Sequence, residues 1–592
     1  MSVSEEKICQ NCKNQFTIEP DDFSFYETIH VPPPTFCPRC RLVRRHTWRN
    51  VFTLYRRPCD LCKKEVFSVY APDKSRTVYC SPCWWSDQWE ASQYGRDYDF
   101  SKPFFEQFAA LLHEAPLLGR FVLEDTLVNS DYTNMVNDLK DCYLIFTSRL
   151  CERAAYSDNL FEVKDSLDLS YSTRSELCYE CFNVRQCYKL YYSIDSEACH
   201  DSYFLKDCVG CSNCFGCAGL RNQNYSIFNK QYTKESYLQE LERLGFVPDS
   251  ARSVEHFEHE SEKIWNSVPV KYFHGSRTTN VSGDYLYNSK NIRSCFFATD
   301  VENSKYCAYL MFGNPVKDSY DFTQYGDGGE LIYECLQSGR GVYGNRFGWC
   351  IWTGTKNCEY GVLNIDSSDC FGCVGVKKKQ YFILNKQYSK EEFFALREKI
   401  VKQMEELPYR DRQGNEYRYG EFFPTELSPF AYNETSAQDE FPLTKADAEA
   451  QGHTWNDNAR PQYVVTKSAG DLPDRSDQAD GNLSQEVIGC AVCGRGYRLT
   501  PSELEFYRRN KIPLPRSCFY CRTEKRTGRK TSQELFPRLC QCAGLSDIKS
   551  QYRNLSQHFH GAGKCPNEFE TSYAPDRPEI VYCEQCYNAE VV

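Results

Sequence analysis

The sequence has no run of 18 apolar residues in its 592 positions, so we expect no membrane-spanning segment. The first ten residues, MSVSEEKICQ, have neither a basic region nor an apolar stretch, so they do not resemble a secretory signal peptide. The chain also lacks an excess of positive charge. Its net charge of −11 argues against a protein that coats nucleic acid along its whole length, although local basic patches remain.

Cysteine, in contrast, is abundant, with 34 residues. In a chain without an export signal, thiols in this number favour metal thiolates over disulfides and indicate a reducing, cytoplasmic compartment. The length favours several domains over a single core.

Two blocks of sequence, related by an offset of 481, share one pattern, which we name module A. Each block has the form CxxC-x24-CxxC. Two such pairs supply the four thiolates of a tetrahedral zinc site. The predicted ligands are Cys9, Cys12, Cys37 and Cys40 in the first copy, and Cys490, Cys493, Cys518 and Cys521 in the second.

A second pattern, module B, follows each module A. The first copy has the ligands Cys59, Cys62, Cys80 and Cys83, and the second has Cys565, Cys583 and Cys586 at an offset of 503. At that offset Ala562 replaces the first cysteine of the module. The fourth ligand must therefore come from upstream, where Cys540, Cys542, His558 and His560 are the candidates, and we favour Cys542. The sequence thus predicts about four zinc ions, all structural because four thiolates close the coordination shell.

Basic side chains follow the last cysteine pair of each module A and could contact nucleic acid or a protein partner. They are Arg41, Arg44, Arg45 and Arg49 in the first copy, and Arg522, Lys525, Arg526 and Arg529 in the second. Arginines beside an aromatic residue such as Trp48 can contact phosphates and stack on bases. The alternative is that they pair with acidic groups of this chain.

The middle of the chain is duplicated at an offset of 153 to 156, most visibly in Cys214-Phe-Gly-Cys217 and Cys370-Phe-Gly-Cys373. Within a copy, cysteines recur at an interval of 21, as in Cys178 and Cys199, among short β-prone runs and polar corners. This period is typical of a parallel β-solenoid in which small residues such as cysteine stack inside. Each copy ends in a predicted helix, with Thr233 or Ser389 as N-cap, that caps the stack.

The run Cys208, Cys211, Cys214 and Cys217 allows a different interpretation, an iron–sulfur cluster. Its spacing lacks the terminal x3 step and the proline of that motif. In the second copy the positions of Cys208 and Cys211 are Asn364 and Ser367, so that copy cannot hold the same cluster.

Taken together, the sequence predicts a multidomain, mostly β protein in which pairs of small zinc ribbons at both ends flank a duplicated parallel β-solenoid with capping helices. The expected segments are ribbons A1 and B1 (1–50, 51–97), a helical connector (98–136), solenoid copy 1 (137–245), a connector (246–285), solenoid copy 2 (286–405), an extended linker (406–485), and ribbons A2 and B2 (486–532, 533–592).

With these modules in view, the chain resembles the multi-zinc-ribbon, cysteine-repeat proteins encoded by reduced-genome, ultra-small bacteria. The phrases that carry the resemblance are Pro33 to Arg41 (PPTFCPRCR), CWWSDQW and EFETSYAPDRPEIVYCEQCY. The resemblance covers nearly the whole chain and implies the architecture and a bacterial cytoplasmic setting. It implies no activity.

Three functions are compatible with these patterns. The first is a zinc-binding scaffold or recognition protein, and it agrees with the lack of a compact catalytic constellation. The second is a β-solenoid enzyme acting on polysaccharides through clustered carboxylates, for which the candidates are Asp158, Asp165, Asp168, Asp195, Asp201 and Asp207. The third is an iron–sulfur redox protein. Aspartates at solenoid corners more commonly cap turns than catalyse.

Overall fold

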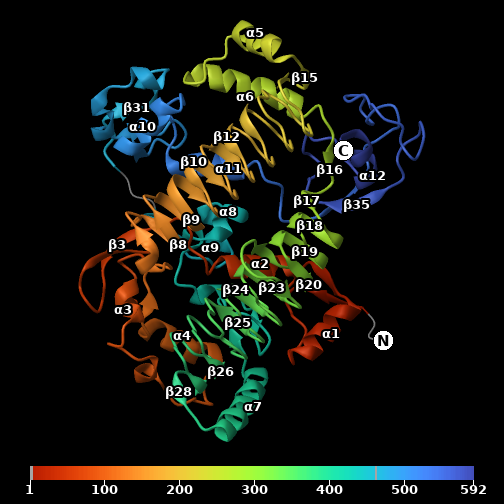
Figure 1. Cartoon of the computed structure of the whole chain (residues 1–592). Coiled ribbons are helices and arrows are strands. Elements are labelled where there is room, and N and C mark those ends of the chain that lie inside the picture. Colours follow the sequence, from red (N-terminus) through yellow and green to blue (C-terminus); the bar gives the residue numbers. More distant parts are fainter. Residues whose placement is uncertain (1–3, 460–462, 592) are drawn as a thin grey trace. The chain divides into compact units, whose positions relative to one another are not determined.

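The computed structural model describes residues 4–459 and 463–591, and it is multidomain and built mostly of strands (Figure 1). The chain divides into two compact units, each made of two distant stretches. Unit 1 combines residues 1–124 with 275–459, and unit 2 combines 125–274 with 460–592. The N-terminal cysteine modules therefore share a unit with the second copy of the duplicated segment, and the C-terminal modules share one with the first copy.

Unit 2 contains a seven-stranded parallel sheet, the first ladder. Its order is β13-β12-β11-β10-β9-β8-β7, so every strand pairs with its sequence neighbour. The register is constant, with residue i opposite residue i+12, as in Leu127 with Leu139, Thr133 with Ile145 and Tyr188 with His200. The strands are β7 (Leu127–Val128), β8 (Thr133–Lys140), β9 (Tyr143–Asp158), β10 (Lys164–Ser170), β11 (Tyr179–Phe182), β12 (Tyr188–Tyr191) and β13 (His200–Tyr203).

The first ladder also repeats at every third residue. Every third position from Ser157 to Cys217 is buried and holds only Ser, Cys, Leu or Val, and every third position from Asn159 to Gly219 has a positive φ. The buried hydroxyls complete the backbone pairing: Ser166 Oγ accepts a hydrogen bond from the Cys178 amide at 3.0 Å. The predicted period of 21 is wrong, because successive strands pair in a register of i to i+12. The interval of 21 between cysteines is a multiple of the three-residue repeat of buried positions.

Unit 1 contains the second ladder, a nine-stranded sheet whose central path runs from β17 to β25 in parallel pairs. Its register is less regular: Leu286 pairs with Ala298 (i+12), Val301 with Val316 (i+15) and Tyr320 with Tyr333 (i+13). The strands are β17 (Gly275–Ser276), β18 (Thr279–Tyr287), β19 (Lys290–Thr299), β20 (Val301–Lys305), β21 (Ala308–Leu310), β22 (Val316–Lys317), β23 (Tyr320–Gly326), β24 (Tyr333–Gly339) and β25 (Arg346–Trp349).

Both ladders end in a short strand pairing followed by a capped helix. Thr233 and Ser389 are the N-caps of α5 (Lys234–Leu244) and α7 (Lys390–Glu406), as predicted, and each side chain accepts a hydrogen bond from the amide three residues on. The short strands are β14 (Ser226–Ile227) and β15 (Lys230–Gln231) in unit 2, and β26 (Ser368–Phe371), β27 (Gln380–Ile383) and β28 (Lys386–Gln387) in unit 1.

Two further helices cover the ladders. Helix α6 (Ala251–Trp265), in the segment expected to be a connector, packs Phe257 against Phe215 of the first copy. Helix α4 (Phe104–Glu114) packs Phe104 against Phe371 of the second copy, although the sequence suggested that it links the ribbons to the first copy. Apolar side chains on one face of each helix supply this contact.

The cysteine modules are small hairpins and helices. In unit 1 they comprise β1 (Glu5–Ile8), β2 (Gln15–Ile18), α1 (Pro20–Thr28), α2 (Pro38–His46), β3 (Tyr55–Pro58), β4 (Glu65–Ser68), β5 (Val78–Tyr79), α3 (Ser81–Trp85) and β6 (Leu117–Leu118). In unit 2 they comprise β31 (Lys467–Ser468), β32 (Ile488–Gly489), β33 (Gly496–Tyr497), α10 (Pro501–Arg509), α11 (Phe519–Thr527), β34 (Phe536–Leu539), β35 (Glu568–Thr571), β36 (Val581–Tyr582) and α12 (Glu584–Val591); β36 pairs in parallel with β16 (Val270–Lys271).

The segment expected to be an extended linker is folded over residues 406–459, so that prediction is wrong there. It contains β29 (Tyr409–Arg410), β30 (Glu416–Tyr417), α8 (Ser436–Glu440) and α9 (Lys445–Ala450), whose N-cap is Thr444. Phe422 and Phe423 are fully buried, and Phe423 stacks on Phe108 with ring centroids 4.9 Å apart. The buried side chains of this segment are isolated aromatic residues such as Phe422 and Phe423, which do not recur at helix or strand spacing. The sequence pattern therefore did not indicate that the segment folds. Residues 460–462 of the predicted linker lie outside the described part.

Candidate metal centres

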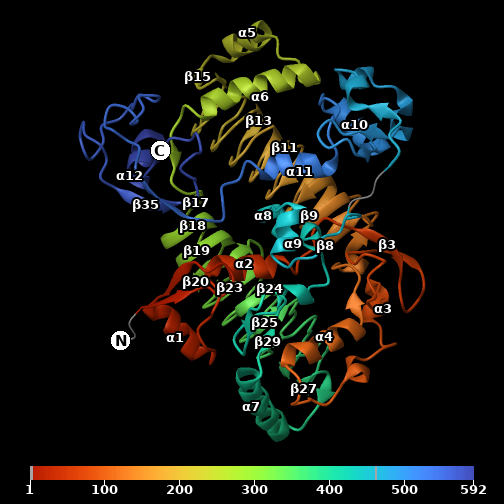
Figure 2. The same ribbon diagram turned by 180° about the vertical axis from the view of Figure 1, so that it is seen from behind.

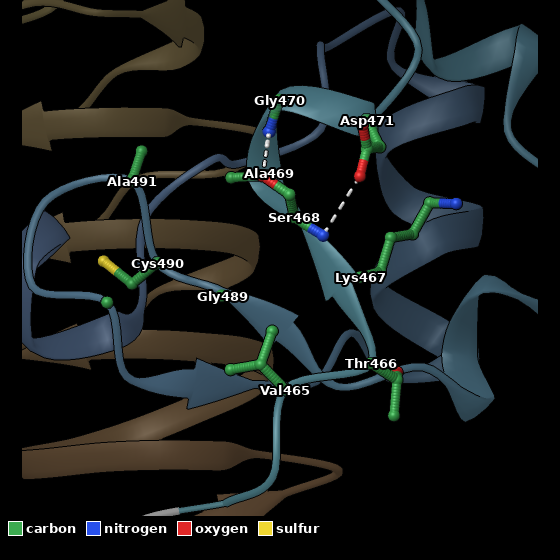
Figure 3. A pocket seen from close by; sticks show the side chains of 11 residues that line it. Val465, Thr466, Lys467, Ser468, Ala469, Gly470, Asp471, Gly489, Cys490 and Ala491 are labelled. Carbon is green, nitrogen blue, oxygen red and sulfur yellow. Dashed lines mark hydrogen bonds between the residues drawn. The ribbon is translucent and has the colours of Figure 1, made fainter.

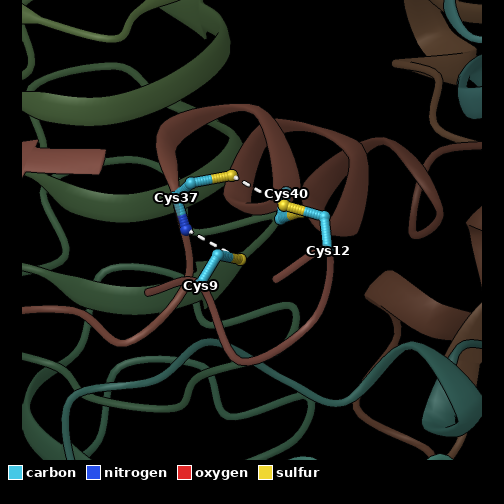
Figure 4. A group of neighbouring side chains, drawn as sticks. All are labelled: Cys9, Cys12, Cys37 and Cys40. Atoms are coloured by element: carbon cyan, nitrogen blue, oxygen red, sulfur yellow. Dashed lines mark hydrogen bonds between the residues drawn. The ribbon is translucent and has the colours of Figure 1, made fainter. Parts of the chain in front are cut away.

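The structure brings the predicted ligands of the first three modules together. In each, four sulfur atoms lie within 4.8 Å of one another: Cys9, Cys12, Cys37 and Cys40; Cys59, Cys62, Cys80 and Cys83; Cys490, Cys493, Cys518 and Cys521. Figure 4 shows the first set, with two cysteines from a hairpin turn facing two at the start of α2. The Sγ atoms of Cys12 and Cys37 lie 3.7 Å apart. A tetrahedral zinc with Zn–S bonds of about 2.3 Å places its sulfurs about 3.8 Å apart.

In the last module the fourth cysteine is Cys540, not Cys542, so the favoured ligand was wrong. The set is Cys540, Cys565, Cys583 and Cys586. Strand β34 pairs with β35 in the register that β3 makes with β4, and Cys540 follows β34 as Cys59 follows β3. The offset from Cys59 to Cys540 is 481, the offset of module A. The match at an offset of 481 holds without a gap to Arg49, and following it ten residues further, to Cys59, identifies Cys540. The offset of 503 applies only after the insertion, so it places Ala562 at the position of Cys59.

One backbone contact recurs in all four sets and supports this assignment. The amide of the third cysteine donates a hydrogen bond to the sulfur of the first. The donor and acceptor pairs are Cys37 and Cys9 at 3.2 Å, Cys80 and Cys59 at 3.3 Å, Cys518 and Cys490 at 3.3 Å, and Cys583 and Cys540 at 3.2 Å. Cys540 therefore has the place that Cys9, Cys59 and Cys490 have.

The same amides favour thiolates, which are the form that binds metal. Burial alone would raise the pKa of Cys59, but backbone hydrogen bonds from Cys80, Cys62 and Leu61 lower it to about 7. The pKa of Cys490 falls to about 6 in the same way, against burial, through the amides of Cys493, Cys518 and Val492. Four thiolates fill a tetrahedral shell and leave no position for a reacting water, so these centres suit a structural metal.

The basic side chains of the first module A are buried in an ion-pair cluster on the second ladder. Helix α2 lies against β23 and β24 (Figure 2). Asp321 contacts Arg41 at 2.9 Å and Arg45 at 3.0 Å, and Glu334 contacts Arg44 at 2.9 Å. Each of these five side chains is at most 2% exposed. Phosphates cannot reach these groups in the folded unit. Of the possibilities that the sequence left open, the structure shows pairing with acidic groups of the same chain.

Unit 2 repeats this cluster at matching positions. Asp168 contacts Arg526 at 2.7 Å and Arg522 at 3.3 Å, and Glu180 contacts Lys525 at 3.0 Å. Burial raises the pKa of Asp168, and the two arginines counter this shift. The Lys525 side chain remains half exposed.

The remaining two basic residues of that prediction are also turned inward. Arg49 is buried, with 5% of its surface exposed, and Arg529 forms an ion pair with Glu258 of α6. The basic residues can be identified from the sequence. Their acidic partners cannot, because they lie in distant parts of the chain.

The cysteines of the Cys208 to Cys217 run are buried in the first ladder. Each sulfur lies near the carbonyl oxygen two residues earlier, at 3.5 Å for Cys208 and 3.3 Å for Cys217. Cys211 also lies beside Cys199, Cys208 and Cys214, whose hydrogen bonds lower the pKa of its thiol. Within the residues that the structure describes, this run is not one of the groups whose ligand atoms all lie within 4.8 Å. The geometry favours the alternative use of these cysteines, as small core residues.

The aspartates suggested for a polysaccharide enzyme have the surroundings of structural residues. Five of the six have a positive φ, the corner conformation that also explains their use in turns: Asp165, Asp168, Asp195, Asp201 and Asp207. Their partners differ. Asp168 pairs with Arg526, Asp207 with Arg221, and the buried Asp158 accepts a hydrogen bond from Ser170 at 2.6 Å. A glycosidase needs two accessible carboxyl groups on one bound sugar. Asp158 and Asp168 meet around Arg526, but they are only 2% and 0% exposed and are paired within the chain.

A hollow of about 680 Å³ lies beside Cys490 (Figure 3). Its lining is mostly small and apolar and holds two charged side chains, Lys467 and Asp471. Asp471 accepts a hydrogen bond from the Ser468 amide at 3.3 Å and so serves its own backbone. This lining provides no set of groups for acid–base chemistry.

Among the described residues, no helix combines the length and apolar character needed to cross a membrane. No protein-family model matches the chain. A comparison with curated proteins gives no match either. The argument for function therefore depends on the centres themselves.

Proposed function

We propose that this protein is a zinc-dependent scaffold in which each unit is a β-solenoid clamped by a pair of zinc ribbons. The solenoid is supported by the constant i to i+12 register of the first ladder and by its buried position at every third residue. A chain that advances by one strand spacing in each such step and turns at every third residue would form four-sided coils with Ser and Cys inside.

Zinc is the metal that best suits these centres. Four thiolates in tetrahedral array select zinc or iron, and among the described residues no cysteine is paired in a disulfide, so all sixteen tetrad cysteines are available to a metal. The amides aimed at sulfur would hold the ligands in place, as the outer contacts of structural metal sites do.

The observation that carries the proposal is that the metal site and the buried ion pairs share one helix, an arrangement that we call the clamp. The last cysteine pair of each module A starts the helix whose basic residues contact the ladder. In the first copy Cys37 is the N-cap of α2, Arg41 follows Cys40 directly, and Arg45 lies one helical turn further on. A metal that fixes the start of α2 therefore also fixes the ion pairs. We infer that the ribbons serve as structural clamps for the solenoids and that recognition uses other surfaces.

A protein partner fits this scaffold better than a nucleic acid. The net charge is −11, and the basic groups that would face phosphates already have acidic partners within the chain. Repulsion of a polyanion by the remaining surface would oppose binding.

Metal analysis of the full chain tests the proposal. Protein purified without oxygen should contain zinc at one ion or more per tetrad, no iron and no visible absorbance from iron–sulfur charge transfer. Cys521→Ser should remove one zinc, and Cys211→Ser, in the first ladder, should remove none. Stoichiometric iron, or zinc loss from Cys211→Ser, would overturn the scaffold.

A further inference from the structure

The last module contains an insertion that the other modules lack. Its first two ligands, Cys540 and Cys565, lie far apart in the sequence, whereas the matching Cys59 and Cys62 form a CxxC pair. The insertion has no helix or strand between the end of β34 at Leu539 and the start of β35 at Glu568.

Apolar burial contributes little to holding this insertion. Tyr552 packs against the core of the module, but three large apolar side chains point to solvent: Leu545 is 77% exposed, Leu555 82% and Phe559 57%. A segment this short without a core needs a covalent or metal crosslink to keep one conformation.

The insertion nevertheless brings three metal-binding side chains to one point. Ligand atoms of Cys542, His558 and His560 lie within 4.8 Å of one another and of Cys586, which is also part of the neighbouring tetrad. His560 Nε2 lies 3.4 Å from Cys586 Sγ. Two thiolates and two imidazoles are a common tetrahedral zinc set.

Hydrogen bonds leave one nitrogen of each ring directed at this point. His558 Nε2 lies 3.0 Å from Glu590 Oε1, so it carries the proton and donates, and Nδ1 is buried with no hydrogen-bond partner among the described residues. His560 Nδ1 donates to the Gly563 carbonyl at 2.9 Å, which leaves Nε2 as the acceptor. Metal-binding histidines are oriented in this way by a carboxylate or a carbonyl.

The thiolate ligand has a similar support. Asn554 Nδ2 donates to Cys542 Sγ at 3.2 Å, and Tyr582 donates its hydroxyl to Asn554 Oδ1 at 2.8 Å. Glu590 is itself held by the amides of Leu555 and Ser556 at 2.8 and 2.9 Å. Cys542, His558 and His560 are thus each held in position by a hydrogen bond to a group outside the ligand set.

We propose that Cys542, His558, His560 and Cys586 bind a second zinc ion that shares the Cys586 thiolate with the tetrad of Cys540, Cys565 and Cys583. A tetrad of four thiolates around one dication carries two excess negative charges, and a second dication on the shared sulfur relieves part of that charge. The insertion is then fastened by its own metal, and the chain holds five zinc ions.

The stoichiometry of the full chain tests this proposal. The protein is purified without oxygen, saturated with zinc, and weighed by native mass spectrometry. Five ions are expected in the wild type and four in the double variant His558→Ala/His560→Ala. The control His259→Ala, on the exposed face of α6 in the same unit, should retain five.

A count of four in the wild type, or an unchanged count in the double variant, overturns the proposal and leaves the four-tetrad scaffold intact. Loss of the tetrads themselves would reduce the count below four and would contradict the scaffold instead. If the double variant fails to fold, Glu590→Gln replaces it, since losing such a second ligand contact weakens metal affinity by about 10- to 100-fold.

The shared sulfur has a spectroscopic signature. In protein loaded with ¹¹³Cd, two cadmium resonances coupled through Cys586 are expected, and Cys542→Ser should remove one resonance and the coupling of the other. Five uncoupled resonances would exclude the bridge.

Discussion

Arg45 of α2 and Asp321 of β23 lie 3.0 Å apart with both side chains fully buried. Arg526 of α11 and Asp168 of β10 have the same relationship in unit 2, at 2.7 Å. The ladder residues differ by 153 positions and the module residues by 481, so the same contact is made by two independently spaced copies. A ribbon helix and a ladder therefore form one structural element in each unit.

Removing one carboxylate of this cluster should destabilise its unit. Asp321→Ala removes one of the two buried carboxylates that Arg41 and Arg45 contact, the other being Glu334, and breaking a buried pair costs about 3–5 kcal/mol. Unfolding in urea, followed by circular dichroism, should show this loss. Asp73→Ala, an exposed residue of the same unit, is the control and should change the free energy of unfolding by less than about 0.5 kcal/mol. Equal effects of the two substitutions would contradict the cluster's role.

Loss of one N-terminal metal ligand should affect more than its ribbon. The sequence alone suggests that Cys40→Ser unfolds the ribbon and spares the solenoid. Because α2 begins at this cysteine pair and carries Arg41, Arg44 and Arg45 into the second ladder, we expect the resistance of unit 1 to proteolysis to fall as a whole. Limited proteolysis with mass spectrometry checks this.

The matched substitution Cys521→Ser should expose unit 2 in the same experiment while unit 1 stays resistant. Survival of an intact fragment covering residues 275–383 in the Cys40→Ser protein would show that the ladder is independent of its clamp.

Nucleic-acid binding through the module A helices should be absent. At low salt, full-length protein should not shift single-stranded RNA in a gel, because Arg44 and Arg526 are buried against acidic side chains. If binding occurs, each phosphate contact steepens its dependence on salt concentration. Affinity that falls steeply with salt and is lost in Lys525→Ala, whose fold should persist because that side chain is half exposed, would restore the phosphate-contact hypothesis.

The cysteines inside the ladders should resist alkylation in the folded protein. Burial raises the pKa of Cys178 and Cys350 well above the usual value, so almost no thiolate is present and the reagent has no access. Iodoacetamide at pH 8 should modify these positions only after denaturation. Rapid labelling of the native protein would contradict the buried core.

Substitutions of Cys178 should show how much the volume of the side chain at this buried position affects the free energy of unfolding. Cys178→Ala should cost about 1 kcal/mol, whereas Cys178→Leu should cost about 1–3 kcal/mol, because it forces extra volume into a closely packed interior. The two unfolding midpoints measure the difference, and a stabilising leucine would indicate an interior cavity.

The sequence by itself determined the parts that depend on local spacing. Two CxxC pairs joined by a short segment define a four-thiolate set, since each pair needs only a tight turn, and the first three sets form as predicted. The N-caps Thr233 and Ser389 were also predictable, because a cap acts within three residues. Even Cys540 was available from the constant 481 offset.

Only the tertiary structure decided which distant groups meet. The cysteine interval of 21 and the register of 12 are both multiples of the three-residue pattern, so the sequence did not indicate the register. The pairing between strands defines it as i to i+12. The acidic partners of Arg45 and Arg526 lie far along the chain. The N-terminal modules share a unit with the second ladder, and the C-terminal modules share one with the first ladder. Ion pairing and burial depend on distances in the folded chain, so the spacing of residues in the sequence does not predict which acidic residue will pair with which arginine.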